Sequence, residues 1–345
     1  MTARADELVG GTHARRSIDR RGEPLLSVRG LKVHFPVGKG SFRRVQSVLR
    51  AVDGVSFDLW RGETLGLVGE SGCGKTTTGQ AVARLIEPTE GDVRFEGIDV
   101  RGLDWGGLRS LRGRVQFVFQ DPFASLNPRM SAGAMLAEAL RVHGLGGSNV
   151  RGRAIELLEQ VGLGPEHIDR YPHEFSGGQR QRLGIARSLS VEPELLILDE
   201  PVSALDVSVR AQVINLLEDL QRDLGLTYLF IAHDLSLIEH VADRVAVMYL
   251  GRIVEVASAV DLYRDPRHPY TRALLSAVPR PDPSIRGKRD RILLQGEVPS
   301  PVHPPTGCAF HTRCPHPERD EPCVHQVPLL EAKGPSHFAA CPKVR

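Results

Sequence analysis

The sequence has no long hydrophobic run. No segment of its 345 residues approaches the roughly 20 consecutive apolar residues that a membrane-spanning helix requires. The first residues are polar and lack the apolar core of a secretory signal. We therefore expect a chain that does not cross a membrane and stays in the cytosol.

The chain also lacks a large net charge. Its formal net charge is +2 at pH 7, which is too small to indicate a polyanionic partner such as nucleic acid. Positive charge gathers at the start, where residues 1–50 contain eleven Lys or Arg and four Asp or Glu. This basic start is either a solvated arm or a contact surface for anionic lipid head groups or a partner subunit.

Tandem repeats and a long coiled-coil insertion are absent as well. Hydrophobic residues make up 41% of the chain and charged residues 25%, as in an ordinary globular protein. The length suggests two domains or three small ones. Residues 1–24 show no hydrophobic period and indicate a flexible leader. Thirteen of the 24 prolines lie in residues 279–345, so we place a domain boundary near Val278 and a separate C-terminal domain after it.

Between these ends, strand patterns alternate with helical ones. Residues 25–35 and 51–59 alternate as half-buried strands do. A short, continuous apolar run at residues 64–68 predicts a strand buried on both faces. Further strands are predicted at residues 114–119, 194–199, 226–232 and 244–249. A 3.6-residue apolar spacing predicts helices at residues 75–85, 132–142, 150–161, 179–189, 207–224 and 268–278. The order predicts an α/β fold with a parallel core sheet.

A glycine-rich loop follows the strand predicted at residues 64–68. Residues 69–76 read GESGCGKT and match the phosphate-binding P-loop pattern between a buried strand and a helix. Its backbone N–H groups can surround phosphate oxygens, while Lys75 reaches the β- and γ-phosphates and Thr76 binds Mg²⁺. We expect the Cys73 thiol to be inert. The predicted ATP-binding residues of the loop are Gly69, Ser71, Gly72, Cys73, Gly74, Lys75, Thr76 and Thr77.

Two acidic residues end another apolar strand, in the sequence LLILDE at residues 195–200. The strand would deliver Asp199 rigidly to a magnesium ion, and Glu200 could orient or deprotonate an attacking water. A strand simply capped by acids is the alternative. The P-loop upstream favours the catalytic interpretation.

The sequence FSGGQ at residues 175–179 precedes a predicted helix. Small residues and free N–H groups at a helix start suit an anion. Since the P-loop already supplies one phosphate site, a second one indicates a nucleotide held by another subunit. A helix N-cap followed by flexible glycines explains the same string equally well. The candidate residues are Ser176, Gly177, Gly178 and Gln179.

The order of these motifs resembles that of the ATP-binding cassette (ABC) ATPases. The P-loop is followed by Gln120 in FQDP, then FSGGQ, LLILDE, SALD at residues 203–206, and His233 after a strand. The resemblance covers about residues 25–255. It implies a P-loop ABC nucleotide-binding domain over residues 25–278, with a mixed sheet core, an antiparallel β subdomain and a helical subdomain inserted at about residues 121–190.

The resemblance also implies a role for each motif. Gln120 would link the metal site to a transmembrane partner, His233 would contact the γ-phosphate, and Asp206 would lie at a dimer seam. Phe35 stands where the family places an aromatic ring against adenine, and a role in the strand core is the alternative. The implied catalytic residues are Lys75, Gln120, Glu200 and His233, and the implied magnesium ligands are Thr76, Gln120 and Asp199.

The segment after the cassette is similar to that of oligopeptide and dipeptide importer ATPases. RHPYTRALL at residues 267–275, GCAFHTRCP at 307–315 and DPFASLNPR at 121–129 carry this similarity. It implies an ATP-hydrolysing subunit, peripheral on the cytoplasmic face of a bacterial membrane, that energises uptake of di- or oligopeptides. The implied partners are a second ATPase subunit, more often a sister chain than a copy, two transmembrane permease subunits and, indirectly, an extracytoplasmic peptide-binding protein. Import of another solute such as nickel and a soluble ABC-type nucleotide switch are the alternatives.

Four of the five cysteines lie in the last 38 residues. Cys308, Cys314, Cys323 and Cys341 are spaced C-x₅-C, C-x₈-C and C-x₁₇-C, without the C-x₂-C pair common in zinc sites. In a cytosolic chain such a cluster indicates metal before disulfides. A [4Fe–4S] cluster, which the resemblance also favours, is the first expectation. Zinc and reduced structural thiols are the alternatives. A metal would stabilise a proline-rich segment that has little core of its own.

Overall fold

The computed structural model describes residues 20, 22–39, 45–121, 125–278 and 291–344. Most of the predicted leader at residues 1–24 and the first residues of the predicted C-terminal domain, 279–290, lie outside this part of the chain. Within it, no helix is both long enough and apolar enough to span a membrane.

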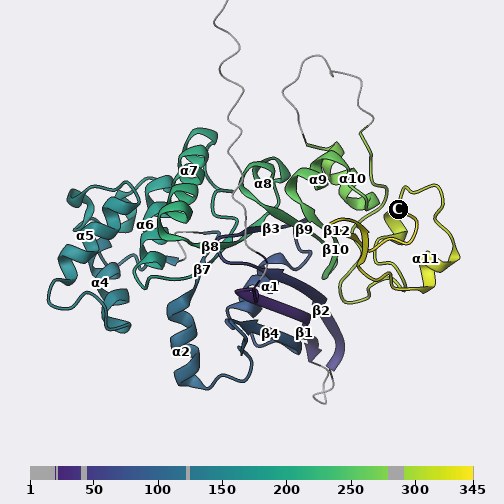
Figure 1. Ribbon diagram of the computed structural model, residues 1–345. Coiled ribbons are helices and arrows are strands. Elements are labelled where there is room, and N and C mark those ends of the chain that lie inside the picture. Colours follow the sequence, from purple (N-terminus) through teal and green to yellow (C-terminus); the bar gives the residue numbers. More distant parts are fainter. Residues whose placement is uncertain (1–19, 21, 40–44, 122–124, 279–290, 345) are drawn as a thin grey trace, which may run out of the picture.

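The elements follow the predicted alternation (Figure 1). Up to residue 278 they are β1 (Leu26–Lys39), β2 (Val45–Leu59), β3 (Thr64–Val68), α1 (Lys75–Val82), β4 (Glu90–Phe95), β5 (Ile98–Asp99), α2 (Trp105–Arg114), β6 (Val115–Val118), α4 (Ala132–Val142), α5 (Val150–Gln160), η1 (Pro165–His167), η2 (Pro172–Glu174), α6 (Gly177–Leu189), β7 (Leu195–Asp199), α7 (Val207–Leu224), β8 (Thr227–Ala232), α8 (Leu235–Val241), β9 (Arg244–Tyr249), β10 (Arg252–Ser258), α9 (Ala259–Arg264) and α10 (Pro269–Ser276). The C-terminal segment adds η4 (His311–Arg313), α11 (Glu321–His325), β11 (Glu331–Gly334) and β12 (His337–Ala339).

The main sheet has eight strands in the order β11-β12-β10-β9-β3-β8-β7-β6. The five strands from β9 to β6 are parallel, whereas β10 and β12 run antiparallel to their neighbours. Every residue of β3, β7 and β8 is buried, which is why these strands have continuous apolar sequences. The prediction of a mixed α/β sheet is confirmed.

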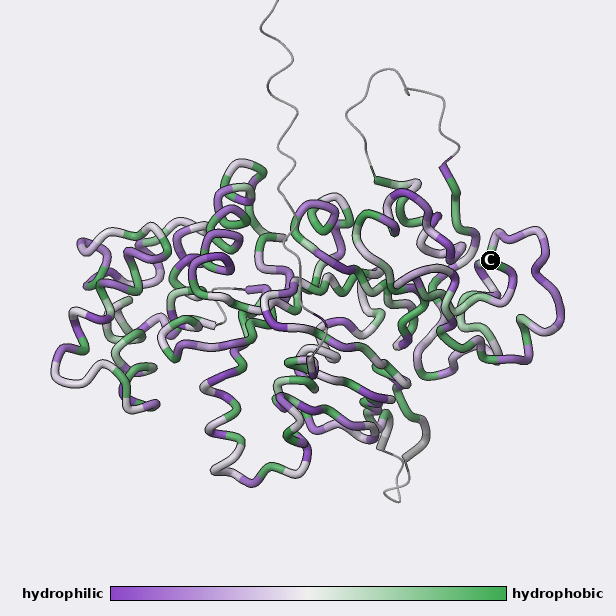
Figure 2. The backbone as a smooth tube through the Cα atoms, viewed as in Figure 1, coloured by the Kyte–Doolittle hydropathy of each residue, from purple (hydrophilic) through white to green (hydrophobic). Residues whose placement is uncertain are grey.

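Alternate residues of the central strands enter different hydrophobic cores, because successive strand side chains point to opposite faces. Leu196 and Phe230 pack in the same core as the buried face of α7. Ile197 and Ile231 belong to a second core that includes α1 residue Ala81. Figure 2 shows the helices alternating between hydrophobic and hydrophilic residues, as expected for helices that bury one face.

Two further units flank this sheet. Strands β2, β1, β4 and β5 form a separate antiparallel sheet in that order. Helices α4, α5 and α6 pack together at the end of the molecule opposite the C-terminal segment (Figure 1). The antiparallel β subdomain and the inserted helical subdomain are both present.

The C-terminal segment is tied to the main sheet. Strand β12 pairs with β10, so that Ala339 lies opposite Glu255. The buried Glu255 carboxylate lies 2.7 Å from Nε2 of His337 and accepts hydrogen bonds from the backbone N–H groups of Arg267 and His268. These contacts compensate the burial of its charge, since a buried carboxylate is tolerated only when it is paired.

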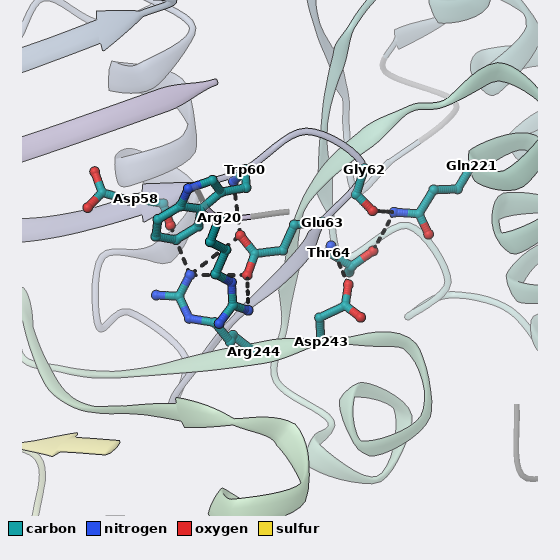
Figure 3. A network of polar contacts seen from close by, with 9 residues as sticks. All are labelled: Arg20, Asp58, Trp60, Gly62, Glu63, Thr64, Gln221, Asp243 and Arg244. Atoms are coloured by element: carbon teal, nitrogen blue, oxygen red, sulfur yellow. Dashed lines mark hydrogen bonds and ion pairs between the residues drawn. The ribbon is translucent and has the colours of Figure 1, made fainter. Parts of the chain in front are cut away.

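A second buried carboxylate fixes the start of β3 (Figure 3). Glu63 is fully buried and accepts a hydrogen bond from the backbone N–H of Trp60 at 2.9 Å. The guanidinium groups of Arg20 and Arg244 lie 3.0 and 3.1 Å from its carboxylate. The same two groups lie 5.3 and 5.1 Å from the Trp60 ring. The residue directly before the strand that leads into the P-loop is thus held by a buried, paired charge.

Candidate nucleotide-binding site

The P-loop follows β3 in a conformation that only glycine can adopt at two positions. Gly69 and Gly74 have φ angles of 155° and 107°. A Cβ atom on Gly69 would lie 2.1 Å from the carbonyl oxygen of Met248, and one on Gly74 would lie 2.1 Å from that of Ala51. These glycines therefore allow the loop to pack closely against β9 and β2.

Lys75 is the first residue of α1 and its side chain folds back into the loop. It is buried, and Nζ donates hydrogen bonds to the carbonyl oxygens of Gly69 at 2.8 Å and Glu70 at 3.1 Å. The Cys73 sulfur lies 3.9 Å from the same nitrogen. Burial raises the pKa of the Cys73 thiol, which keeps it protonated and unreactive.

A cavity of about 570 Å³ opens beside the loop. This volume is within the range of small-molecule sites. The predicted residues that line it are Phe35, Ser71, Gly72, Gly74, Lys75, Thr76, Thr77, Gln120, Glu200 and His233. Leu49, Ala51 and Pro301 complete the lining. The structure thus gathers residues from three of the predicted motifs, together with Gln120 and Phe35, around one space.

Thr76 and Asp199 meet at the edge of this space. The Thr76 hydroxyl donates a hydrogen bond to Oδ1 of Asp199 at 3.0 Å, across from α1 to the end of β7. Burial raises the pKa of Asp199, while the hydrogen bond from Thr76 acts in the opposite direction. A hydroxyl and a carboxylate side by side are oxygen ligands of the kind Mg²⁺ prefers, so these two residues fit the magnesium role.

Glu200 is contacted by two other predicted residues. Its Oε2 accepts a hydrogen bond from Nε2 of Gln120 at 2.9 Å and lies 3.0 Å from Nδ1 of His233. The backbone of Glu200 has a left-handed φ of 46°, and its N–H donates to the carbonyl oxygen of Ile231. Such strained conformations concentrate at functional sites. Gln120, predicted also as a magnesium ligand, lies against Glu200 here.

The FSGGQ residues and Asp206 do not line the cavity. Ser176 instead caps α6, because its hydroxyl accepts the backbone N–H of Gln179 and the Gln179 side chain accepts that of Ser176. A Cβ atom on Gly178 would lie 2.3 Å from the Val209 side chain, so this glycine allows α6 to approach α7. Asp206 caps α7 through the backbone N–H of Val209.

The four C-terminal cysteines are free and line one cavity of about 260 Å³. Burial raises the pKa of Cys308 to about 11, and it also raises the pKa values of Cys314 and Cys341. Among the described residues, no three His, Cys, Asp or Glu side chains are arranged to hold a metal ion. The four cysteines that the sequence predicts as ligands therefore share one cavity, but in the described part of the chain they are not arranged as metal ligands.

Two contacts at the site were not predicted. Pro301 reaches the cavity from the C-terminal segment, where the sequence offers only one proline among many. Glu70, the second residue of the P-loop, forms a bidentate ion pair with Arg313. These partners are 243 positions apart, so no spacing in the sequence indicates the contact.

Comparison with known protein families gives two matches. A model described as "ABC transporter" matches residues 52–203, and one described as "Oligopeptide/dipeptide transporter, C-terminal region" matches residues 254–323. The oligopeptide transport ATP-binding protein AppF of Bacillus subtilis is 54% identical to this chain over 321 residues, covering 92% of this chain and 97% of the relative.

The chain belongs to the ABC transporter family. Within it, this ABC protein belongs with the ATP-binding subunits of oligopeptide/dipeptide importers. The oligopeptide transport ATP-binding protein OppF of Salmonella typhimurium is 51% identical over 326 residues, covering 93% of this chain and 96% of the relative.

Solved cassettes share the fold of this ABC protein. The MJ0796 cassette, solved as a dimer in a post-hydrolysis state with ADP and Pi, matches with a TM-score of 0.59 and 26% identity, covering 68% of this chain and 98% of that chain. The cbiO1 protein of Clostridium perfringens, part of the transporter complex cbiONQ, matches with a TM-score of 0.61 and 27% identity, covering 71% and 92%.

Proposed function

We propose that this ABC protein hydrolyses Mg·ATP in the cavity beside the P-loop and that the reaction drives import of di- or oligopeptides. The observation that carries the proposal is that residues from three sequence motifs line one cavity. Lys75 and Thr76 come from the P-loop, Glu200 from the end of β7, and His233 from the end of β8. Active sites are usually cavities lined by both apolar and polar groups, with residues of shifted pKa, such as Asp199 here, beside them.

Each residue has a role that its position supports. The P-loop backbone and Lys75 would bind the β- and γ-phosphates, and Phe35 on the same cavity would stack on the base. Thr76, Asp199 and Gln120 would hold magnesium, which supplies charge neutralisation at the phosphates when it is bound. Nζ of Lys75, which donates to two carbonyl oxygens of the loop in this structure, would exchange them for phosphate oxygens.

Glu200 would act on the attacking water. Its side chain is 14% exposed and lines the cavity, so a carboxylate oxygen can accept a proton from water placed beside the γ-phosphate. His233 and Lys75 would stabilise charge that develops on the transferred phosphoryl group. Gln120 and His233 share Oε2 of Glu200 in this structure, and one of these contacts would have to loosen for that oxygen to accept a hydrogen bond from water.

A second half-site would complete the enzyme. Ser176, Gly177, Gly178 and Gln179 sit at the N-terminus of α6, outside the P-loop cavity. We propose that they, with Asp206 at the seam, face the nucleotide of a second cassette, so that two chains close over two Mg·ATP. A sister chain rather than a copy is the proposed partner. Closure would pull on two transmembrane subunits, and hydrolysis would reset them.

We place the protein at the cytoplasmic face of a bacterial membrane, as a peripheral subunit with a peptide-binding protein acting on the far side. Its ATPase domain would comprise residues 25–278 and its C-terminal domain residues 279–345. The second candidate is a transporter for another solute such as nickel. A soluble nucleotide switch is less well supported, because the C-terminal match at residues 254–323 is to transporters.

The test is purification and transport. A tagged chain should co-purify from detergent extract with a multispanning membrane subunit. In vesicles, the assembled complex should hydrolyse ATP faster when a peptide-loaded binding protein is present. Stimulation by nickel but not by peptides would favour the second candidate, and isolation without any membrane subunit would favour a soluble switch.

We also propose that Cys308, Cys314, Cys323 and Cys341 hold a metal group, with a [4Fe–4S] cluster as the preferred occupant. Their thiols share one cavity, which supports a common ligand. The similarity of the C-terminal segment to importer ATPases favours the cluster, whose cysteine spacings vary, and zinc is the alternative.

The analysis of iron and acid-labile sulfide in anaerobically purified protein tests this assignment. About four irons and four sulfides per chain, with a broad visible absorption band, are expected. Colourless protein that contains only zinc would overturn the cluster in favour of zinc. Protein that contains neither iron nor zinc would favour the remaining alternative, in which the cysteines are reduced structural thiols.

A further inference from the structure

The C-terminal segment contacts the region of the nucleotide site at two points, the cavity and the P-loop. Pro301 lines the cavity, and its carbonyl oxygen accepts a hydrogen bond from the backbone N–H of Arg50 at 3.1 Å. Farther along, Arg313 contacts the P-loop itself through Glu70. The segment that follows the cassette therefore lines the proposed ATP site through Pro301 and contacts the P-loop through the Arg313–Glu70 pair.

The Arg313–Glu70 pair has the geometry of a strong interaction. Two guanidinium nitrogens of Arg313 donate to the two carboxylate oxygens of Glu70, at 2.8 and 3.1 Å. The Arg313 side chain is only 8% exposed, so water screens the pair weakly. The Glu70 carboxylate accordingly raises the pKa of Arg313. Bidentate pairing fixes the orientation of both groups as well as their separation.

The surroundings hold both partners in place. The Arg313 guanidinium lies 5.9 Å from the centre of the Tyr249 ring, and Tyr249 itself packs against Tyr270. The hydroxyl of Tyr270 accepts a hydrogen bond from the backbone N–H of Glu70 at 2.9 Å. Glu70 is thus anchored by its side chain and by its backbone N–H.

The position of Glu70 gives this pair an electrostatic consequence. Its own carbonyl oxygen accepts a hydrogen bond from Nζ of Lys75, so its carboxylate belongs to the loop that would surround a triphosphate. An unpaired carboxylate there would repel phosphate. Arg313 neutralises that charge and fixes the backbone that directs Lys75.

We infer that Arg313 is a positioning residue for nucleotide binding, through which the C-terminal cysteine segment maintains the affinity of the P-loop for ATP. The inference rests on the proposed ATP site. It assigns to this segment a role at the nucleotide, separate from any group held by the cysteines. Because Arg313 directly precedes Cys314, a structural change at the cysteine cavity would reach the P-loop through this residue.

The test is a fluorescent ATP analogue titrated into the full chain. Arg313→Ala should weaken binding about tenfold, the effect of losing one favourable charge interaction. The affinity of Arg313→Lys for the analogue should lie between those of wild type and Arg313→Ala, because lysine keeps the charge but not the bidentate contact. Lys333→Ala is the control, since it breaks another ion pair of the same segment, with Glu331 at 3.2 Å, away from the loop.

Glu70→Gln separates a role at the nucleotide from a merely structural one. Glu70→Gln alone should bind the analogue at least as tightly as wild type, because it removes the carboxylate while Arg313 keeps its positive charge. In the Glu70→Gln background, Arg313→Ala should lose most of its tenfold effect. A purely structural Arg313 would weaken binding equally in both backgrounds, and that outcome would overturn the inference, as would wild-type binding by Arg313→Ala.

Controls keep these outcomes distinct. Melting temperatures identify any variant that fails to fold, and Arg313→Lys and Glu70→Gln then carry the test, because a Lys variant with wild-type affinity contradicts the bidentate role. If wild type and Lys333→Ala themselves fail to bind the analogue, the proposed function fails and the inference falls with it.

Discussion

Oε2 of Glu200 lies 3.0 Å from Nδ1 of His233, although the two residues directly follow different strands of the main sheet. The same oxygen accepts the amide of Gln120 at 2.9 Å. The oxygen that we propose as the proton acceptor is thus occupied by side chains rather than presented freely to the cavity. Nucleotide binding that draws His233 or Gln120 away would release it, so the arrangement links the arrival of the substrate to the activation of the base.

Replacement of Glu200 should separate binding from hydrolysis. Glu200→Gln should bind Mg·ATP with near-normal affinity yet hydrolyse it 10²–10⁴-fold more slowly, roughly the contribution of a general base. It should also accumulate the closed pair of cassettes. Phosphate release by the assembled complex and size-exclusion chromatography with ATP measure the two effects. Glu87→Gln, at an exposed carboxylate in the loop between α1 and β4, is the control, and wild-type turnover by Glu200→Gln would refute the role of Glu200.

Asp199 should show opposite effects on stability and on function. Burial disfavours its charged form, while Asn retains an oxygen that accepts the hydrogen bond from Thr76. Asp199→Asn should therefore raise the free energy of unfolding of the nucleotide-free protein, on the order of 1 kcal/mol. It should weaken magnesium-dependent ATP binding, because an amide is a poorer ligand than a carboxylate. Urea unfolding and titrations with and without Mg²⁺ check both effects, and a loss of stability would contradict the first.

The buried Glu63 should be important for folding. Glu63→Gln leaves the largely buried Arg244 and the more exposed Arg20 without their carboxylate partner. We expect the free energy of unfolding to fall by about 3 kcal/mol, as when one partner of a buried ion pair is removed. Urea denaturation measures it, with Glu87→Gln again as an exposed control. A loss below about 1 kcal/mol would show that water reaches the network.

His268 should make stability depend on pH. Burial lowers its pKa to about 4, against the opposing effect of Glu255, whereas a histidine in the unfolded chain titrates near pH 6.5. Between these values the unfolded state binds a proton that the folded state does not, so stability falls as the pH falls, by up to about 1.4 kcal/mol per unit.

The variant His268→Asn isolates this effect. Asn keeps an acceptor for the backbone N–H of Tyr270, which His268 caps at 3.1 Å, but it does not titrate. Urea unfolding of both proteins at pH 7, 6 and 5 gives the comparison, in which other titrating groups cancel. If the free energy of unfolding falls equally in the two proteins as the pH is lowered, His268 is not responsible for the pH dependence.

The sequence predicts the central strands well for a physical reason. Strands buried on both faces need apolar residues at consecutive positions, as in β3, β7 and β8. Strand β10 is not predicted, because the charged Glu255 interrupts its apolar run. That charge is satisfied by His337, 82 positions later, and a pairing of this length has no local signal.

The residues of the site also divide into those that a local sequence pattern predicts and those that only long-range contacts reveal. Motifs identify Lys75, Thr76, Asp199, Glu200 and His233, because each carries chemistry at the end of an apolar strand or in the glycine-rich loop after it. Their convergence depends on the sheet order β3-β8-β7, which the order of the chain does not reveal. The pairing of Glu70 with Arg313 depends on the fold of the C-terminal segment, so it could only be found in three dimensions.

The pairing of β12 with β10 also protects the molecule from its neighbours. A strand at the rim of a sheet offers unpaired N–H and C=O groups to any other chain. Here the last residues of the polypeptide supply β12 and β11 as two short strands on that rim. Truncation ahead of residue 331 would bare the backbone of β10, and the shortened protein should then self-associate through strand addition long before its ATP site is affected.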